Sequence, residues 1–193
     1  MNRAILDELI GMDGHDQAVR AELAADGSLF DGYHPRMAEV HRANAARLRE
    51  IIAEFGWPGR ALVGDDGAEA AWRIAQHSIG EPAFMRRCRD LLDEAGRRGD
   101  VPRWQFAYID DRIRMFEGRP QRFGTQFRWG PGGPEPYSLE DPARVEVWRS
   151  ELGLPPLAEV IDRARANPPQ EPRDRAAADA AELVWRRSVG WVS

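Results

Sequence analysis

The sequence contains no lysine, only one cysteine and no long apolar run. All 27 basic side chains are therefore arginines, which we attribute to a GC-rich gene. Cys88 cannot form an intrachain disulfide, as is usual in a reducing compartment. Because no run of about 18 apolar residues exists, we expect no membrane span. The first residues carry acids without an apolar h-region, so we expect no secretory signal and a cytoplasmic location.

The charge balance is acidic, with 32 acidic residues and a net charge of −5. This balance argues against a nucleic-acid-binding protein that depends on charge alone. The 193 residues, of which 42% are hydrophobic and 31% charged, are typical of a globular chain with a sizeable core. We therefore expect a small molecule or a peptide as partner, and neither a nucleic acid nor a membrane.

Apolar residues recur at helical spacing through most of the chain, which predicts a mainly α fold. We expect an irregular multi-helix bundle with one short β-hairpin or extended glycine-rich loop at 118–142. The expected helices span about 2–26, 35–55, 68–78, 82–95, 102–117, 143–152, 156–166 and 173–189. A short strand is expected over 122–129, followed by a turn at 131–134.

The domain organisation follows from the position of proline. Residues 1–166 are predicted to form a single helical domain. Residues 167–172 are rich in proline and form a linker. The helix that follows is expected to dock on the domain or on a partner, and it is our candidate for a homo-oligomer contact.

One position of the apolar stripe in the first helix is occupied by Asp16. An unpaired buried carboxylate is costly, and Arg20 lies four residues on, at the spacing of an intrahelical partner. In the other interpretation, Gly11 and Gly14 break the helix, and Asp16 caps a second one. The sequence leaves both interpretations open.

Polar residues also interrupt the next helices. Asn44 stands in the stripe of the helix at 35–55, and a buried amide needs several hydrogen-bond partners. His41, three residues earlier, is more typical of a packed and hydrogen-bonded histidine than of a ligand. Gln76 and His77 flank the inward face of their helix, where they either fix the helix end or line a polar site.

The helix at 102–117 is apolar on much of its circumference and should be central. Asp111 and Arg112 lie within it and resemble an internal ion pair, which is also what a purely structural salt bridge would look like. The long glycine-rich loop that follows is of a kind that often carries function. Its polar residues Gln121, Thr125 and Gln126 are therefore further candidates.

Several standard motifs are missing from the sequence. It has no HExxH, CxxC or GxSxG pattern, no P-loop and no dinucleotide fingerprint. Cys88 lies on an apolar stripe and is predicted to be a buried core thiol. A composite site of His41, His77 and an aspartate across helices is only weakly suggested, so we expect no metal and no other cofactor.

The remaining polar residues would destabilise the fold unless they satisfy one another or bind a ligand. Such a set suits a small polar or carboxylated molecule. We predict His77 as general acid or base, with Asp111 and Thr125 as further catalytic residues. The predicted substrate-binding residues are Asp16, Gln17, Arg20, Asn44, Gln76, Arg112, Gln121 and Gln126.

The order of these motifs resembles that of a bacterial family called domain of unknown function 6624. The resemblance rests on Asp16-Gln17-x-x-Arg20, Asn44, Gly56-Trp57-Pro58, Gln76-His77, Asp111-Arg112 and Gln121-x-Phe123-Gly124-Thr125-Gln126, over about residues 5–160. The family often has tyrosine where this chain has Phe123. The resemblance implies matching motif positions and no activity.

Two functions remain open. The first is a cofactor-independent enzyme that acts on a small polar or carboxylated metabolite or on a peptide end. The second is a non-catalytic binding or interaction module, in which the polar residues form a structural network. Its working surface would be the aromatic residues Trp129, Tyr137 and Trp191, expected to be exposed.

Overall fold

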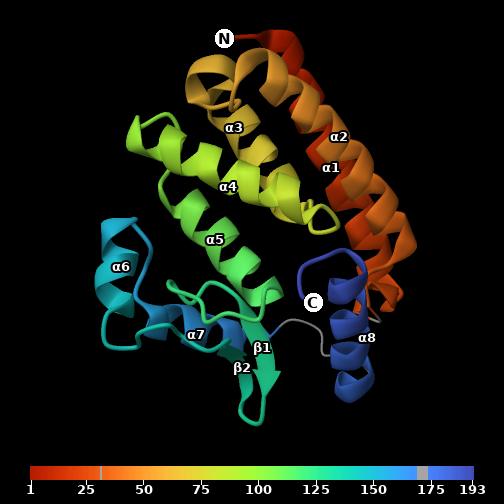
Figure 1. Ribbon diagram of the computed structural model, residues 1–193, viewed down its shortest axis with the longest axis vertical. Helices are drawn as coiled ribbons and strands as arrows, with labels where there is room; N and C mark the ends of the chain where they lie inside the picture. Colours follow the sequence, from red (N-terminus) through yellow and green to blue (C-terminus); the bar gives the residue numbers. More distant parts are fainter. Residues whose placement is uncertain (31, 169–173) are drawn as a thin grey trace.

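The computed structural model describes residues 1–30, 32–168 and 174–193 (Figure 1). The fold is mainly α, as predicted, with one short hairpin. The helices are α1 Arg3–Ala25, the 3-10 helix η1 Ser28–Phe30, α2 Pro35–Phe55, α3 Arg60–His77, α4 Pro82–Arg97, α5 Trp104–Phe116, α6 Val145–Glu151, α7 Leu157–Ala166 and α8 Arg175–Ser188. The strands β1 Phe127–Gly130 and β2 Gly133–Pro136 pair antiparallel.

The molecule is elongated, and different helices gather at its two ends (Figure 1). The long helices α1 and α2 run side by side, and α3 packs against both (Figure 1). Helices α4 and α5 contact each other, and α5 leads towards the other end, where the hairpin, α6 and α7 gather. Helix α8 lies there too, beside the ends of α1 and α2. Among the described residues, no helix is long and apolar enough to cross a bilayer.

Proline and glycine set the bounds of α2 as the sequence predicts, and a histidine that was not predicted to do so caps its start. Pro35 occupies the first turn, where its missing N–H costs nothing, and the Nδ1 of His34 accepts the N–H of Arg36. Gly56 ends the helix with a φ of 77°, a conformation that residues with a Cβ rarely adopt.

Of the two interpretations of Asp16, the structure shows the one with an unbroken first helix, because α1 continues through Gly11 and Gly14 and Asp16 lies inside it. The predicted start of the next helix but one was wrong. Helix α3 starts at Arg60 rather than near residue 68, because the expected loop around Gly64 is a kink within helical chain. A helix tolerates this kink since Gly64 alone has non-helical angles, with a φ of 71°.

The main core lies between α1, α2, α3, α4 and α5. Cys88 is fully buried within it, as predicted. Trp191 also belongs to it, so its predicted exposure was wrong. Its ring stacks on Phe116 with the centroids 5.2 Å apart, and its Nε1 donates to the carbonyl of Ile79 at 2.7 Å. These contacts attach the segment after α8 to the core.

Candidate functional site

Three side chains from three helices meet at one buried point. Asp16 comes from α1, His41 from α2 and His77 from α3. The Nδ1 of His77 lies 3.0 and 3.1 Å from the two carboxylate oxygens of Asp16, and the Nε2 of His41 lies 3.2 Å from Oδ2. Asp16 is 1% exposed. Its partners are thus the two histidines and not Arg20, so the expected intrahelical pair was wrong.

The two nitrogen atoms of His41 have different surroundings. Nδ1 lies 2.8 Å from the hydroxyl of Tyr33, whose ring stacks on the imidazole. Nε2 is buried and close to Asp16, but this contact lacks the direction of a hydrogen bond. Nε2 therefore has no hydrogen-bond partner among the described residues. A buried nitrogen in this state calls for an explanation.

Burial and charge act against each other in this cluster. Burial raises the pKa of Asp16, but the contacts from His41 and His77 outweigh it and hold that pKa well below the usual value. Burial lowers the pKa of His77, and Asp16 opposes this shift. An ionised carboxylate next to two imidazoles can orient a proton-transfer residue or bind a cation.

Arg112 lies on α5, next to this cluster. Its Nε donates to the Oε1 of Gln126 at 3.1 Å, and its NH1 donates to the carbonyl of Gln76 at 3.1 Å. No carboxylate pairs with it among the described residues. Burial and the charge of Arg20 lower its pKa to about 10, so the guanidinium stays charged at neutral pH.

Asp111 points elsewhere, so the expected Asp111–Arg112 ion pair was wrong. Its carboxylate accepts the backbone N–H groups of Arg122, Phe123 and Thr125, and also the hydroxyl of Thr125. Burial raises its pKa, and these hydrogen bonds oppose the shift. Asp111 and Thr125 thus contact each other, but no described hydrogen bond joins either residue to His77. Their catalytic roles stay predictions.

Of the other predicted site residues, Gln121, Asn44 and Gln76 are buried, whereas Gln17 and Arg20 are exposed. Gln121 braces the loop, since its side chain bonds to the backbone of Gln126 and of Tyr137. Asn44 is buried and donates to the carbonyl of Met12 at 3.4 Å. Gln76 is buried as well, and its Oε1 has no partner among the described atoms.

Gln17 and Arg20 lie on the exposed side of α1. Gln17 lies near the carboxyl group of Asp13. Arg20, in contrast, reaches a pocket of about 650 Å³ that His41, Arg112 and Gln126 also line. We call this the arginine pocket. The arginines that line it are Arg20, Arg112, Arg128, Arg175 and Arg186.

Helix α8 forms one wall of the arginine pocket. It contributes Asp179, Glu182 and Trp185 besides its arginines. Trp185 packs edge-on against Tyr33, with 5.0 Å between the ring centroids. Arg128 pairs with Glu135 of β2, and Arg186 pairs with Glu182 of α8.

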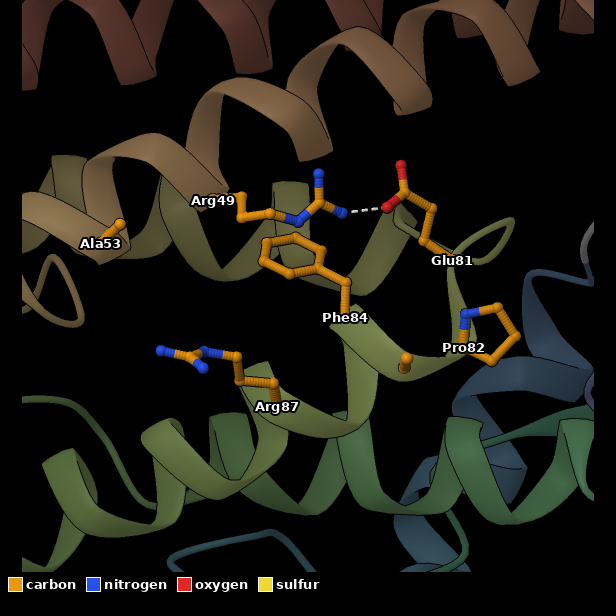
Figure 2. Close-up of a pocket in the computed structure, with 7 residues that line it drawn as sticks. Arg49, Ala53, Glu81, Pro82, Phe84 and Arg87 are labelled. Atoms are coloured by element: carbon orange, nitrogen blue, oxygen red, sulfur yellow. Dashed lines mark hydrogen bonds and ion pairs between the residues drawn. The ribbon is translucent and has the colours of Figure 1, made fainter.

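A second hollow, of about 510 Å³, lies between α2 and α4 (Figure 2). There the guanidinium of Arg49 lies 4.5 Å from the ring centre of Phe84 and pairs with Glu81, while Arg87 lines the rim. None of the nominated polar residues line it. We therefore take the arginine pocket, with the adjoining cluster, as the candidate site.

Sequence reasoning missed part of this site. Tyr33 carried no signal, because it precedes α2 and reaches His41 only through the turn of the chain. The wall formed by α8 was missed because α8 lies far along the sequence from the other pocket residues, and no local pattern shows that it packs beside them. His41 had been seen as a packed histidine, and its position beside Asp16 required the fold.

The comparison with known families gives a match over most of the chain. The model of a family of unknown function, DUF6624, matches residues 4–166, and the chain belongs to this family. The match confirms the resemblance read from the motifs. It ends before α8, so one wall of the arginine pocket lies outside the matched residues. No curated protein and no solved structure matches the chain.

Proposed function

We propose that this member of the DUF6624 family is an enzyme that acts on a small anionic molecule bound in the arginine pocket. The observation that carries the proposal is Arg112, a charged side chain without a carboxylate partner among the described residues, at the wall of a pocket. Burying an unpaired charge is costly. A carboxylated or phosphorylated ligand would supply the missing negative charge.

A comparison of Arg112 with Arg149 shows why the pocket next to Arg112 supports ligand binding. Arg149 is more deeply buried than Arg112, at 2% exposure, and donates to the carbonyls of Pro155 and Phe123. It lines neither of the two hollows. Arg149 is therefore explained as a structural tie, whereas Arg112 has space beside it for a ligand.

In this proposal the cluster of Asp16, His41 and His77 is the reactive centre. His41 lines the arginine pocket, so a ligand held by Arg112 would lie next to the cluster. His77 belongs to this centre, in line with the acid or base role expected from the sequence. The non-catalytic alternative has lost one support, because Trp191 is buried and offers no exposed surface.

The test is a ligand screen on the whole chain. We would record melting curves with monocarboxylates, dicarboxylates and phosphate monoesters, and follow any stabilising compound by NMR for turnover. We expect a ligand that stabilises wild type and not Arg112→Met. The control is Arg87→Met, which changes an exposed arginine of the second hollow.

Two results would count against the proposal. Equal stabilisation of wild type and Arg112→Met by every anion would remove Arg112 as the anion-binding residue. A ligand that binds through Arg112 but is never converted would support a binding module instead of an enzyme.

A further inference from the structure

We propose that Asp16, His41 and His77 bind a divalent first-row transition metal ion. One oxygen of Asp16, the Nε2 of His41 and the Nδ1 of His77 lie within 4.8 Å of one another. The inference takes only the location of the pocket from the proposed function, and each can fail without the other. It revises the expectation from sequence of a protein without cofactor.

The spacing of the donor atoms fits an ion. Metal bonds to imidazole nitrogen and carboxylate oxygen are about 2.0–2.2 Å long, so ligand atoms on a tetrahedral ion lie ~3.4 Å apart. The nitrogens of the two histidines lie 3.0 and 3.2 Å from Asp16. A small outward movement of these side chains would admit the ion.

The state of His41 distinguishes this site from a simple hydrogen-bonded cluster. The side chain is 6% exposed, and its Nε2 has no hydrogen-bond partner among the described atoms, although it faces Asp16. A nitrogen that carries a free lone pair towards a metal needs no such partner. Its other nitrogen, Nδ1, lies 2.8 Å from the hydroxyl of Tyr33, whose oxygen can accept a hydrogen bond from the Nδ1–H group. Histidine ligands of metals are commonly fixed by such an outer hydrogen bond.

The donor set also limits the kind of ion. Two imidazoles and one carboxylate favour zinc and its first-row neighbours over magnesium or calcium, which prefer oxygen ligands. Three protein ligands are typical of catalytic sites, in which a further position stays open for solvent or substrate. Since His41 lines the arginine pocket, we place the open position on the pocket side.

A bound cation would also strengthen the attraction of the site for anions. Asp16 is the buried carboxylate of the cluster, and an ion there would offset its charge. Together with Arg20 and Arg112 the site would then be strongly positive. With the ion bound, His77 acts as a ligand, so the acid or base role that the proposed function keeps for His77 is given up.

The experiment uses the whole chain and Zn²⁺ alone. Protein dialysed against a chelator is titrated with Zn²⁺ by calorimetry, and Mg²⁺ serves as the comparison ion. We expect one Zn²⁺ per chain and no comparable Mg²⁺ binding. Titration with Co²⁺ should give visible absorption bands typical of nitrogen and oxygen ligands.

The variants identify the ligands. His41→Gln and Asp16→Asn should abolish the Zn²⁺ signal, and Tyr33→Phe should weaken binding by about 10–100-fold because it removes only the outer hydrogen bond. His15→Ala is the matched control, since His15 is exposed on α1 next to Asp16, and it should leave binding unchanged. Circular dichroism checks that each variant folds. If His41→Gln does not fold, the Zn²⁺ affinities of Tyr33→Phe and His15→Ala test the proposal in its place.

The inference is overturned if wild type binds Zn²⁺ no more tightly than the Asp16→Asn and Tyr33→Phe variants, or if His15→Ala weakens binding as much as they do. Anion binding through Arg112 without any Zn²⁺ binding would contradict the metal proposal but not the proposed function. Zn²⁺ binding without any anionic ligand would contradict the proposed function but not the metal proposal.

Discussion

Thr125 donates both its backbone N–H and its hydroxyl to the same carboxylate oxygen of Asp111, at 2.9 and 3.0 Å. Asp111 lies on α5, so this pair ties the glycine-rich loop to the central helix. The loop in turn supplies Gln126, which contacts Arg112. The position of the guanidinium thus depends on a carboxylate that does not touch it in the described structure.

Removing this carboxylate should loosen the loop. Asp111→Ala leaves buried N–H groups without an acceptor, each of which costs about 1–3 kcal/mol. We expect a large fall in the free energy of unfolding, measured by urea denaturation. Thr125→Ala loses one hydroxyl contact and should cost only about 1 kcal/mol. Equal losses for the two variants would show that the hydroxyl, and not the backbone, holds the loop.

A substitution at Gly124 tests the backbone conformation of the same loop. Its φ is 67°, and a Cβ there would lie 2.9 Å from the side chain of Leu157. Gly124→Ala should therefore destabilise the fold by about 1–2 kcal/mol. Gly132→Ala is the control, because a Cβ at that position meets nothing within 4 Å. Thermal melting of both variants distinguishes them, and similar melting temperatures would contradict the predicted strain.

Arg149, which is buried, and Arg112, which is part-buried, should differ in their effect on stability. Arg149→Met leaves the buried carbonyl of Phe123 without its donor and should cost at least about 2 kcal/mol. Arg112→Met also loses two hydrogen bonds, but it removes a part-buried charge that no carboxylate pairs with among the described residues, so the net change should stay within about 1 kcal/mol. Urea denaturation in the absence of ligand measures both. A strongly destabilised Arg112→Met would indicate a structural role for this residue.

Cys88 should not react in the folded protein. It is 0% exposed, and burial raises the pKa of its thiol far above the usual value. The thiolate is the reactive form, so raising the pH from 7 to 9 should not speed alkylation while the protein stays folded. Iodoacetamide labelling followed by mass spectrometry measures this, with urea-unfolded protein as the reactive control. Rapid labelling of the native chain would show that the core opens locally.

The helices could be predicted because their signals are local. Pro35, Gly56 and Pro82 mark helix ends in the sequence, and the structure places the ends there. The burial of Asp16 could also be inferred, because it stands in an apolar stripe. Its partners could not be, since His41 and His77 come from other helices, and only the packing of these helices brings them together.

Neighbours in sequence were misleading where the fold separates them. Asp111 and Arg112 are adjacent, but successive residues of a helix point about 100° apart, so one faces the loop and the other the pocket. Trp191 looked like an exposed aromatic because nothing near it in the sequence indicates the ring of Phe116 on which it stacks. Whether the nominated residues perform catalysis is still a prediction.

Each of the helices α1, α2 and α3 contributes one residue to the cluster of Asp16, His41 and His77, and this affects how the helices move. Anything bound at the cluster would add a link between α1, α2 and α3, which already share one hydrophobic core. Hydrogen exchange of their backbone amides should therefore slow together on binding, while α6 and α7 should exchange at unchanged rates. The same dependence implies that a core substitution that displaces one of these helices would disturb the site without touching any of its residues.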